Sequence, residues 1–200
     1  MIIGLTGAYC AGKNHVAALF EMRDLPVLDV DKLGYQVLEL EKEKIYALFG
    51  SDLQKTDGSL DRRLLGRRVF GKPEKLAALE AIVHPLVNKM VDEWAETQKG
   101  NCVINAALLH KSTIFNRLNR IILVKAPLIT RIFRAKRRDK LSWGEIMRRI
   151  NNQKGFNTQY LSINSSSICA EIYSIENPGL SGSRNLKLER RIDKYLEGID

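Results

Sequence analysis

Short apolar runs alternate with longer amphipathic stretches along most of this chain. A short apolar run bounded by turn residues is typical of a buried strand, and apolar positions at i, i+3 and i+4 are typical of a helix. The pattern predicts strands at residues 1–6, 26–30, 102–107, 120–124 and 170–175. It predicts helices at residues 13–21, 32–49 with one break, 62–70, 73–94, 128–138, 142–153 and 185–196. We expect the polar, serine-rich residues 155–167 to form a loop.

Strands that alternate with helices favour an α/β fold, in which helices cover both faces of a parallel sheet. Residues 32–98 interrupt this alternation, because they carry helical patterns and no strand pattern. We therefore expect a single domain over residues 1–200, with a helical subdomain inserted into an α/β core.

Three local signals refine the expected helices. Ser142 is followed three residues later by Glu145, which predicts a capping box at a helix start. Pro85 follows His84 within an otherwise helical pattern, and a proline there kinks or restarts a helix. Asp31 directly precedes a helical stretch and is a favourable residue for its N-cap.

A glycine-rich loop follows the first expected strand. Residues Gly7 to Asn14, GAYCAGKN, have the spacing G-x-x-x-x-G-K and lie between a strand and a helix, as a phosphate-binding loop does. Glycines let backbone amides face an anion, and the helix N-terminus adds its dipole. Lys13 can reach the terminal phosphates of a nucleotide as a mobile charge. The pattern ordinarily ends in Ser or Thr, whose hydroxyl holds Mg²⁺, whereas Asn14 offers a carbonyl oxygen. A turn that binds nothing, and a loop that binds without turnover, are the alternatives.

Two carboxylates come at the end of the second expected strand. Alternation along an extended segment puts Asp29 and Asp31 on one side, and ligands of open α/β sheets lie at the carboxyl ends of strands. A carboxylate there can orient or accept the proton of an attacking hydroxyl. This role for Asp31 is compatible with its role as a helix cap.

Positive charge is concentrated in one stretch. The chain carries 32 basic and 23 acidic residues, a net charge of +9. Residues 111–154 hold 13 Lys and Arg against two acids, while the rest holds 19 basic and 21 acidic residues. Arg131, Arg134 and Arg138 can share one helix face there, where arginine would stabilise the charge of a transferring phosphoryl group. The stretch alone does not distinguish a solvated helix face, a polyphosphate site and a nucleic-acid site.

The composition is that of a globular protein with a sizeable core: 200 residues, of which 44% are hydrophobic and 28% charged. Its three widely spaced cysteines form neither a disulfide framework nor a paired metal motif, which favours the cytoplasm. The start of the chain lacks the pattern of a signal peptide. No run approaches the roughly 20 apolar residues that a membrane span needs. We therefore expect no membrane partner.

Several blocks of the chain, taken in order, resemble the dephospho-coenzyme A kinase family. The blocks are IIGLTGAYCAGKNHVAALF, VLDVDKLGYQV, DGSLDRRLLGRRVFGKPEKLAALEAIVHPLV, NRIILVKAPLITRIFRAKRRDKLSWGEIMRRINNQ and IYSIENPG. The third block is the most specific, because other P-loop kinases lack its D-G-x-L-D-R and H-P motifs.

The resemblance implies transfer of the ATP γ-phosphoryl group to the ribose 3′-hydroxyl of dephospho-CoA, with Mg²⁺. It implies a P-loop NTPase-like α/β fold, a parallel five-stranded sheet flanked by helices, with a helical substrate-binding insertion and a helical lid. The expected core is 1–31, 101–127 and 155–200, the insertion about 32–100, and the lid about 128–154. We expect a monomer or small homo-oligomer, with nucleic acid an unlikely partner.

Carried over position by position, the resemblance assigns catalytic roles to Lys13, Asp31 and Arg134. It assigns ATP binding to Gly7, Tyr9, Cys10, Ala11, Gly12, Lys13, Asn14, His15, Arg138 and Asn177, the last near the adenine. It assigns dephospho-CoA binding to Asp31, Arg62, His84 and Leu108. Asn14 is the one metal ligand that it suggests.

The sequence departs from the family pattern at a few of these positions. Asn14 and His15 stand where the family has Ser and Thr, and Ala107 and Lys111 replace the Pro and Glu of its P-L-L-x-E motif. Glu176 replaces an Asp.

The leading hypothesis, which rests on the motif matches in ordered blocks, is a dephospho-CoA kinase. The alternatives are a catalytically weakened nucleotide- or CoA-binding protein and a basic nucleic-acid binder.

Overall fold

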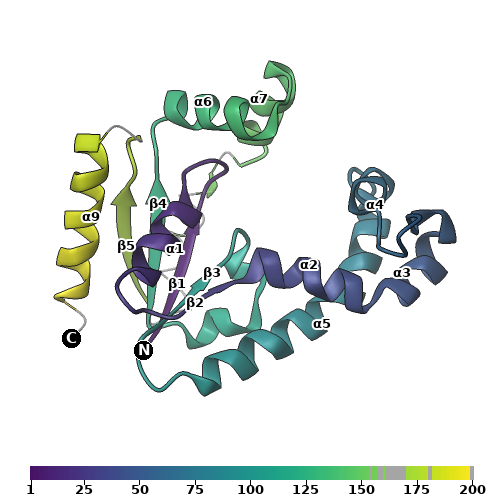
Figure 1. Ribbon diagram of the computed structural model, residues 1–200, viewed down its shortest axis with the longest axis horizontal. Coiled ribbons are helices and arrows are strands. Elements are labelled where there is room, and N and C mark those ends of the chain that lie inside the picture. The colour runs from purple at the N-terminus through teal and green to yellow at the C-terminus, as the bar shows by residue number, and fades with distance from the viewer. Residues whose placement is uncertain (154, 157–159, 161–169, 180–181, 199–200) are drawn as a thin grey trace. The chain divides into compact units, whose positions relative to one another are not determined.

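The computed structural model describes residues 1–153, 155–156, 160, 170–179 and 182–198 (Figure 1). Most of the loop expected at 155–167 lies outside these residues. Across the described chain no helix is both long and apolar enough to cross a membrane.

A five-stranded sheet forms the centre of the fold, with the order β2-β3-β1-β4-β5. Its strands are β1 (Ile2–Gly7), β2 (Val27–Asp29), β3 (Cys102–Asn105), β4 (Arg120–Lys125) and β5 (Glu171–Glu176). Strand β1 pairs in parallel with β3 and with β4, and β4 pairs in parallel with β5. Leu5 is opposite Asn105 and Gly7 is opposite Val124, so the loop after β1 begins between the ends of two neighbouring strands. The predicted parallel α/β architecture is confirmed.

The helices agree closely with the periodicity of the sequence. They are α1 (Lys13–Glu21), α2 (Val30–Leu40), α3 (Lys42–Phe49), α4 (Arg62–Val69), α5 (Pro73–Thr97), α6 (Leu128–Asp139), α7 (Trp143–Asn151) and α9 (Gly182–Leu196). Short 3₁₀ turns lie at η1 (Ser51–Leu53), η2 (Leu109–Lys111) and η3 (Thr113–Arg117). The break expected within 32–49 separates α2 from α3.

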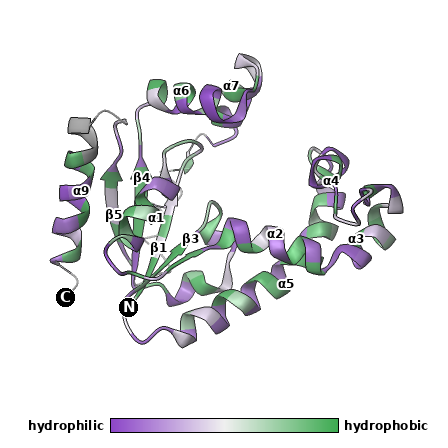
Figure 2. Ribbon diagram, viewed as in Figure 1, coloured by the Kyte–Doolittle hydropathy of each residue, from purple (hydrophilic) through white to green (hydrophobic). Residues whose placement is uncertain are grey.

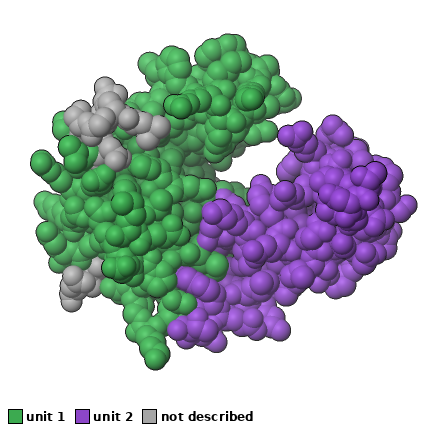
Figure 3. Space-filling view, in the orientation of Figure 1, with its two compact units in different colours: residues 1–28, 98–200 green, residues 29–97 purple. Residues whose placement is uncertain are grey.

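The described chain divides into two compact units (Figure 3). Unit 1 comprises residues 1–28 and 98–200, and unit 2 comprises residues 29–97. Unit 1 therefore holds the glycine-rich loop together with α6 and α7, the expected lid. Unit 2 is built from helices α2 to α5.

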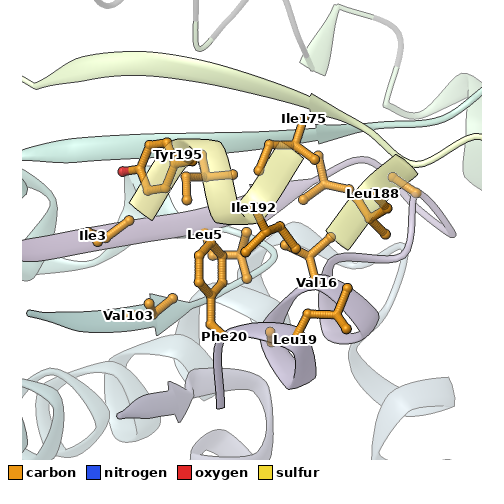
Figure 4. Close-up of a cluster of buried hydrophobic side chains, with 14 residues drawn as sticks. Ile3, Leu5, Val16, Leu19, Phe20, Val103, Ile175, Leu188, Ile192 and Tyr195 are labelled. Carbon is orange, nitrogen blue, oxygen red and sulfur yellow. The ribbon is translucent and has the colours of Figure 1, made fainter. Parts of the chain in front are cut away.

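The main core of unit 1 lies between one face of the sheet and helices α1 and α9 (Figure 4). Ile3 and Leu5 project from β1 toward Phe20 of α1 and Ile192 of α9, and all four side chains are buried. The strands are largely hydrophobic in Figure 2, whereas α9 alternates between hydrophobic and hydrophilic positions. Burial of these side chains stabilises the fold by about 25 cal/mol for each Å² of apolar surface removed from water. This packing fixes β1, and with it the start of the loop.

Unit 2 has its own apolar core. Ile45 and Phe49 of α3 pack with Leu53 of η1 and with Leu65 and Val69 of α4. Arg68 of α4 ties this cluster together, because its guanidinium pairs with Asp52 through two nitrogens and donates to the Phe49 carbonyl oxygen.

The structure corrects three of the local expectations and confirms one. The side chain of Asp29, not Asp31, caps α2 by accepting a hydrogen bond from the Lys32 amide at 3.1 Å. Asp31 lies within the first turn of α2, so it does not share a strand face with Asp29, because the chain turns helical one residue earlier than the alternation suggests. Helix α5 continues through Pro85, so the proline does not restart the helix, since packing of its apolar face outweighs the lost hydrogen bond. The capping box of Ser142 and Glu145 is present.

Candidate functional site

The glycine-rich loop has the backbone of an anion-binding turn. Cys10 and Gly12 have positive φ angles of 59° and 93°, and the Ala11 amide donates to the Ala8 carbonyl oxygen at 2.8 Å. Two constraints favour glycine at position 12. One is its positive φ angle, and the other is that a Cβ there would lie 2.3 Å from Nδ2 of Asn177. Among the described residues no side chain caps the N-terminus of α1, which begins directly after Gly12. Its first amides and its dipole are thus directed toward the loop, where an anion binds favourably.

Lys13 lies at the opening of the loop, between two asparagine side chains. Its Nζ is 3.0 Å from Oδ1 of Asn14 and 3.0 Å from Oδ1 of Asn105. Nδ2 of Asn105 in turn donates to Oδ1 of Asn14 at 3.2 Å. Asn105 ends strand β3 and is 1% exposed, so this polar side chain is buried in contact with the loop.

Arg134 of α6 connects the loop to the end of β5. One guanidinium nitrogen donates to the Ala11 carbonyl oxygen at 2.9 Å, and the other donates to Oδ1 of Asn177 at 2.9 Å. Asn177, 1% exposed, donates from Nδ2 to the same Ala11 oxygen at 3.1 Å. Burial lowers the pKa of Arg134 from its usual value, which still leaves the group charged at neutral pH.

Tyr9, at the tip of the loop, is held by residues of α6 and α7. Its hydroxyl donates to the Asp139 carboxylate, and the guanidinium groups of Arg138 and Arg149 lie 5.4 and 5.6 Å from its ring centre. Arg131 donates from Nε to the Tyr9 carbonyl oxygen at 2.8 Å. These five side chains, Tyr9, Arg131, Arg138, Asp139 and Arg149, are called the Tyr9 clamp below.

The next loop residue, Cys10, packs among apolar side chains of the same helices, with Ala135, Ile146 and Ile150. Burial raises the pKa of its thiol, so the side chain is a packing group rather than an activated nucleophile. His15 lies in the first turn of α1 and is half-buried.

The basic stretch is partly committed to this loop. Arg131 and Arg134 donate to loop carbonyl oxygens, and Arg138 and Arg149 pair with Asp139. Nη2 of Arg131 is buried and has no hydrogen-bond partner among the described residues, which an anionic oxygen would supply. Part of the charge is therefore arranged around the loop, while other basic residues of the stretch, such as Arg137 and Arg148, are exposed.

The remaining predicted residues lie elsewhere. Leu108, in unit 1, precedes η2 and is 49% exposed. Asp31 of α2, Arg62 of α4 and His84 of α5 belong to unit 2. Arg62 lies over the ring of Tyr35, 4.6 Å from its centre, while Asp31 is exposed and His84 is half-buried.

Asn14 does not suit Mg²⁺ in this arrangement. An amide oxygen has two lone pairs, and Oδ1 of Asn14 already accepts from Lys13 and Asn105. Mg²⁺ prefers carboxylates, phosphates and water. No group of three or more His, Cys, Asp or Glu that could hold a metal ion occurs within the described residues.

Sequence reasoning missed Asn105 and Asp139. A polar residue at the carboxyl end of the apolar run CVIN was the available signal for Asn105, because such ends carry ligands in parallel sheets. Asp139 gave no comparable signal, since an acid inside the sequence RRDK is typical of a solvated helix face.

The chain matches the family model described as dephospho-CoA kinase over residues 1–162. The chain belongs to the dephospho-CoA kinase family. Dephospho-CoA kinases of Shouchella clausii and Thermus thermophilus are 38% and 39% identical to it over 160 and 150 residues. These alignments cover 76% and 74% of this chain, and 81% and 73% of the relatives. The predicted resemblance is confirmed, and a kinase family carries with it the use of ATP. Asn177 lies beyond the matched residues.

Solved structures support the same fold. TT1252 from Thermus thermophilus has a TM-score of 0.80 at 33% identity and covers 100% of this chain and 98% of its own. The dephospho-CoA kinase of Campylobacter jejuni has a TM-score of 0.63 at 21% identity, covering 100% and 97% of the two chains. A shikimate kinase from Bacteroides thetaiotaomicron has a TM-score of 0.55 at 15% identity, covering 98% of each. The last two likenesses concern the fold alone.

Proposed function

We propose that this protein transfers the γ-phosphoryl group of ATP to the ribose 3′-hydroxyl of dephospho-CoA, giving CoA and ADP. The observation that carries the proposal is the loop of residues 7–14, which joins positive-φ backbone, an open helix N-terminus, Lys13 and Arg134 in a member of this kinase family. Charge develops on the phosphoryl oxygens during such a transfer, and fixed cations around them stabilise the transition state.

On the ATP side, the loop amides hold the phosphates and the Lys13 ammonium contacts the terminal ones. Arg134 is half-buried beside the loop carbonyls, so it offers its charge with little reorganisation. The position of Asn177 beside Gly12 and Arg134 supports contact with the nucleotide. The Tyr9 clamp, including Arg138, holds the tip of the loop.

On the acceptor side, the bond between O3′ and the γ-phosphorus forms as the bond from that phosphorus to the bridging oxygen of ADP breaks. The proton of the 3′-hydroxyl passes to the carboxylate of Asp31, acting as general base. We assign Arg62, His84 and Leu108 to dephospho-CoA from their places in the family motifs. A guanidinium such as that of Arg62 suits a phosphate of the substrate.

Mg²⁺ enters the proposal as the companion of ATP. A divalent cation neutralises charge on the phosphate oxygens during phosphoryl transfer. The donors at Asn14 do not suit a resident ion, so no protein ligand is assigned to it. Free thiols at Cys10 and Cys102 support a reducing compartment, and we propose the cytoplasm.

The test is an incubation of the purified chain with ATP, MgCl₂ and dephospho-CoA, in which CoA and ADP are separated and quantified. We expect both products in equal amounts, and their loss in Lys13→Met. Lys99→Met, at an exposed position after α5, is the matched control and retains turnover. Tight ATP binding without CoA formation would instead identify a nucleotide-binding protein with no kinase activity.

A further inference from the structure

The side chains at the two positions where P-loop enzymes hold a metal contact each other and Lys13. In such enzymes Mg²⁺ is held by a loop hydroxyl and by an aspartate on a neighbouring strand. Asn14 stands at the first position, and Asn105, at the end of β3 beside β1, stands at the corresponding place for the second. Both side chains are neutral amides, so the pair supplies no negative charge to a cation.

The hydrogen bonds within this group leave little capacity for a metal. Oδ1 of Asn14 accepts from the Lys13 ammonium at 3.0 Å and from Nδ2 of Asn105 at 3.2 Å, which uses both lone pairs. Oδ1 of Asn105 accepts from the same ammonium at 3.0 Å. A divalent ion at either oxygen would face a lysine cation only 3.0 Å from its ligand atom.

The same contacts suit another task. Lysine carries a flexible four-carbon stem, and ordering it costs side-chain conformational entropy. Two acceptors that converge on Nζ restrict that freedom before any ligand arrives. Asn105 is itself fixed by burial in the sheet, so it gives the ammonium a rigid reference point.

We propose that Asn14 and Asn105 are positioning residues for the Lys13 ammonium, and that this chain binds ATP phosphates through its own cations and amides without needing Mg²⁺ in the binding step. The inference rests on ATP as the ligand of the proposed function. It assigns the neutralisation of the triphosphate's negative charge to Lys13, Arg131, Arg134 and the N-terminus of α1.

The first experiment measures ATP dissociation constants by calorimetry in MgCl₂ and in EDTA at equal ionic strength. We expect the wild-type constants to differ by less than about threefold. The double variant Asn14→Ser, Asn105→Asp restores a hydroxyl and a carboxylate, and its ATP affinity should become at least about tenfold dependent on Mg²⁺. A wild-type affinity that falls tenfold or more in EDTA, with Asn14→Ala abolishing this difference, overturns the inference.

The second experiment is a double-mutant cycle on ATP affinity in EDTA. Asn14 is exposed, so Asn14→Ala should fold normally, and we expect it to weaken binding several-fold. In a Lys13→Met background the same change should have no effect, because Asn14 acts through the ammonium. Additive effects in the two backgrounds contradict a positioning role.

These outcomes are separable from a failure of the proposed function. ATP binding that is insensitive to EDTA, with no CoA formed from dephospho-CoA, removes the kinase proposal and leaves the inference standing. A wild-type chain that binds ATP in neither buffer overturns the inference itself.

Discussion

Several side chains at this site make hydrogen bonds to the backbone of the glycine-rich loop. Arg134 illustrates this, because its two guanidinium nitrogens connect the Ala11 carbonyl oxygen with the Asn177 side chain. The spacing G-x-x-x-x-G-K was sufficient to predict the loop and Lys13, since both follow from local backbone geometry. Asn105 could not be assigned in the same way, because its contact with Lys13 depends on which strand pairs with β1. Sequence periodicity gives strands but does not give their order.

Arg134 provides a test at the residue scale. Arg134→Ala should lower kcat by about 10²- to 10³-fold, on the order of 2.7–4 kcal/mol of transition-state stabilisation. Arg134→Lys keeps the charge but loses the two-pronged contact, so we expect it to recover only part of the rate. Steady-state kinetics with ATP and dephospho-CoA measure both effects.

Arg137→Ala is the matched control, because Arg137 is an exposed arginine of the same helix. It should leave kcat within twofold of the wild type. An equal loss in both variants would mean that the overall charge of α6, rather than the contact of Arg134 with the loop, determines the rate.

Between elements, the contact of α6 and α7 with the loop is the main feature. The capping box at Ser142 and the amphipathic pattern predicted both helices, and the structure agrees on their bounds to within two residues. The Tyr9 clamp was not predictable, because its members are widely separated in sequence and its acid, Asp139, is embedded in basic residues. Asp139 accepts from Tyr9 and from Arg138, so one carboxylate links the loop to the helix.

The clamp can be tested by removing one hydroxyl. Tyr9→Phe deletes the donor to Asp139 and keeps the ring under Arg138 and Arg149, so the free energy of unfolding should fall by about 1 kcal/mol. Tyr9→Ala also removes the ring and should cost more. Urea unfolding followed by circular dichroism gives the stability, and hydrogen exchange of the α6 and α7 amides locates the effect.

The stability difference between wild type and Tyr9→Phe should depend on pH. Hydrogen bonding from Arg138 lowers the pKa of Asp139 below its usual value, so its stabilising contribution is present above a pH of about 3.9 and is lost as the pH falls through the lowered pKa. Wild type and Tyr9→Phe should therefore converge in stability in acid. A difference that persists unchanged to pH 2 would show that the hydroxyl stabilises the chain through another group.

At the scale of the whole molecule, the proposed residues divide between the two compact units. The loop, Arg134 and Asn177 belong to unit 1, and Asp31, Arg62 and His84 belong to unit 2. The α/β class of unit 1 and the helical nature of residues 29–97 were predictable from periodicity alone. The roles of Arg62 and His84 came from family motifs, because an exposed arginine and a half-buried histidine on helices carry no chemical signature of their own. The role of Asp31 was also suggested by its place just after the second strand.

This division predicts separable kinetic effects. Asp31→Asn should lower kcat by about 10²- to 10⁴-fold, because it removes the general base, while ATP affinity stays unchanged. Arg62→Ala should raise KM for dephospho-CoA about tenfold or more through loss of a charged hydrogen bond. Gln36→Ala, at an exposed position of α2, is the control. A fall in ATP affinity with either change would contradict the proposed assignment of unit 2 to dephospho-CoA.

The hydrogen bond from Asn177 to the Ala11 carbonyl oxygen joins positions 166 residues apart. During synthesis on the ribosome, it can form only after nearly the whole chain has been made. The loop leaves the ribosome early, whereas both flanking strands of β1 and the arginine and asparagine that hold the loop emerge later. At about 5–20 residues per second, a nascent chain waits on the order of ten to thirty seconds before Asn177 can reach Ala11. A translation product that stops before β5 therefore lacks the completed nucleotide site, however well its first half folds.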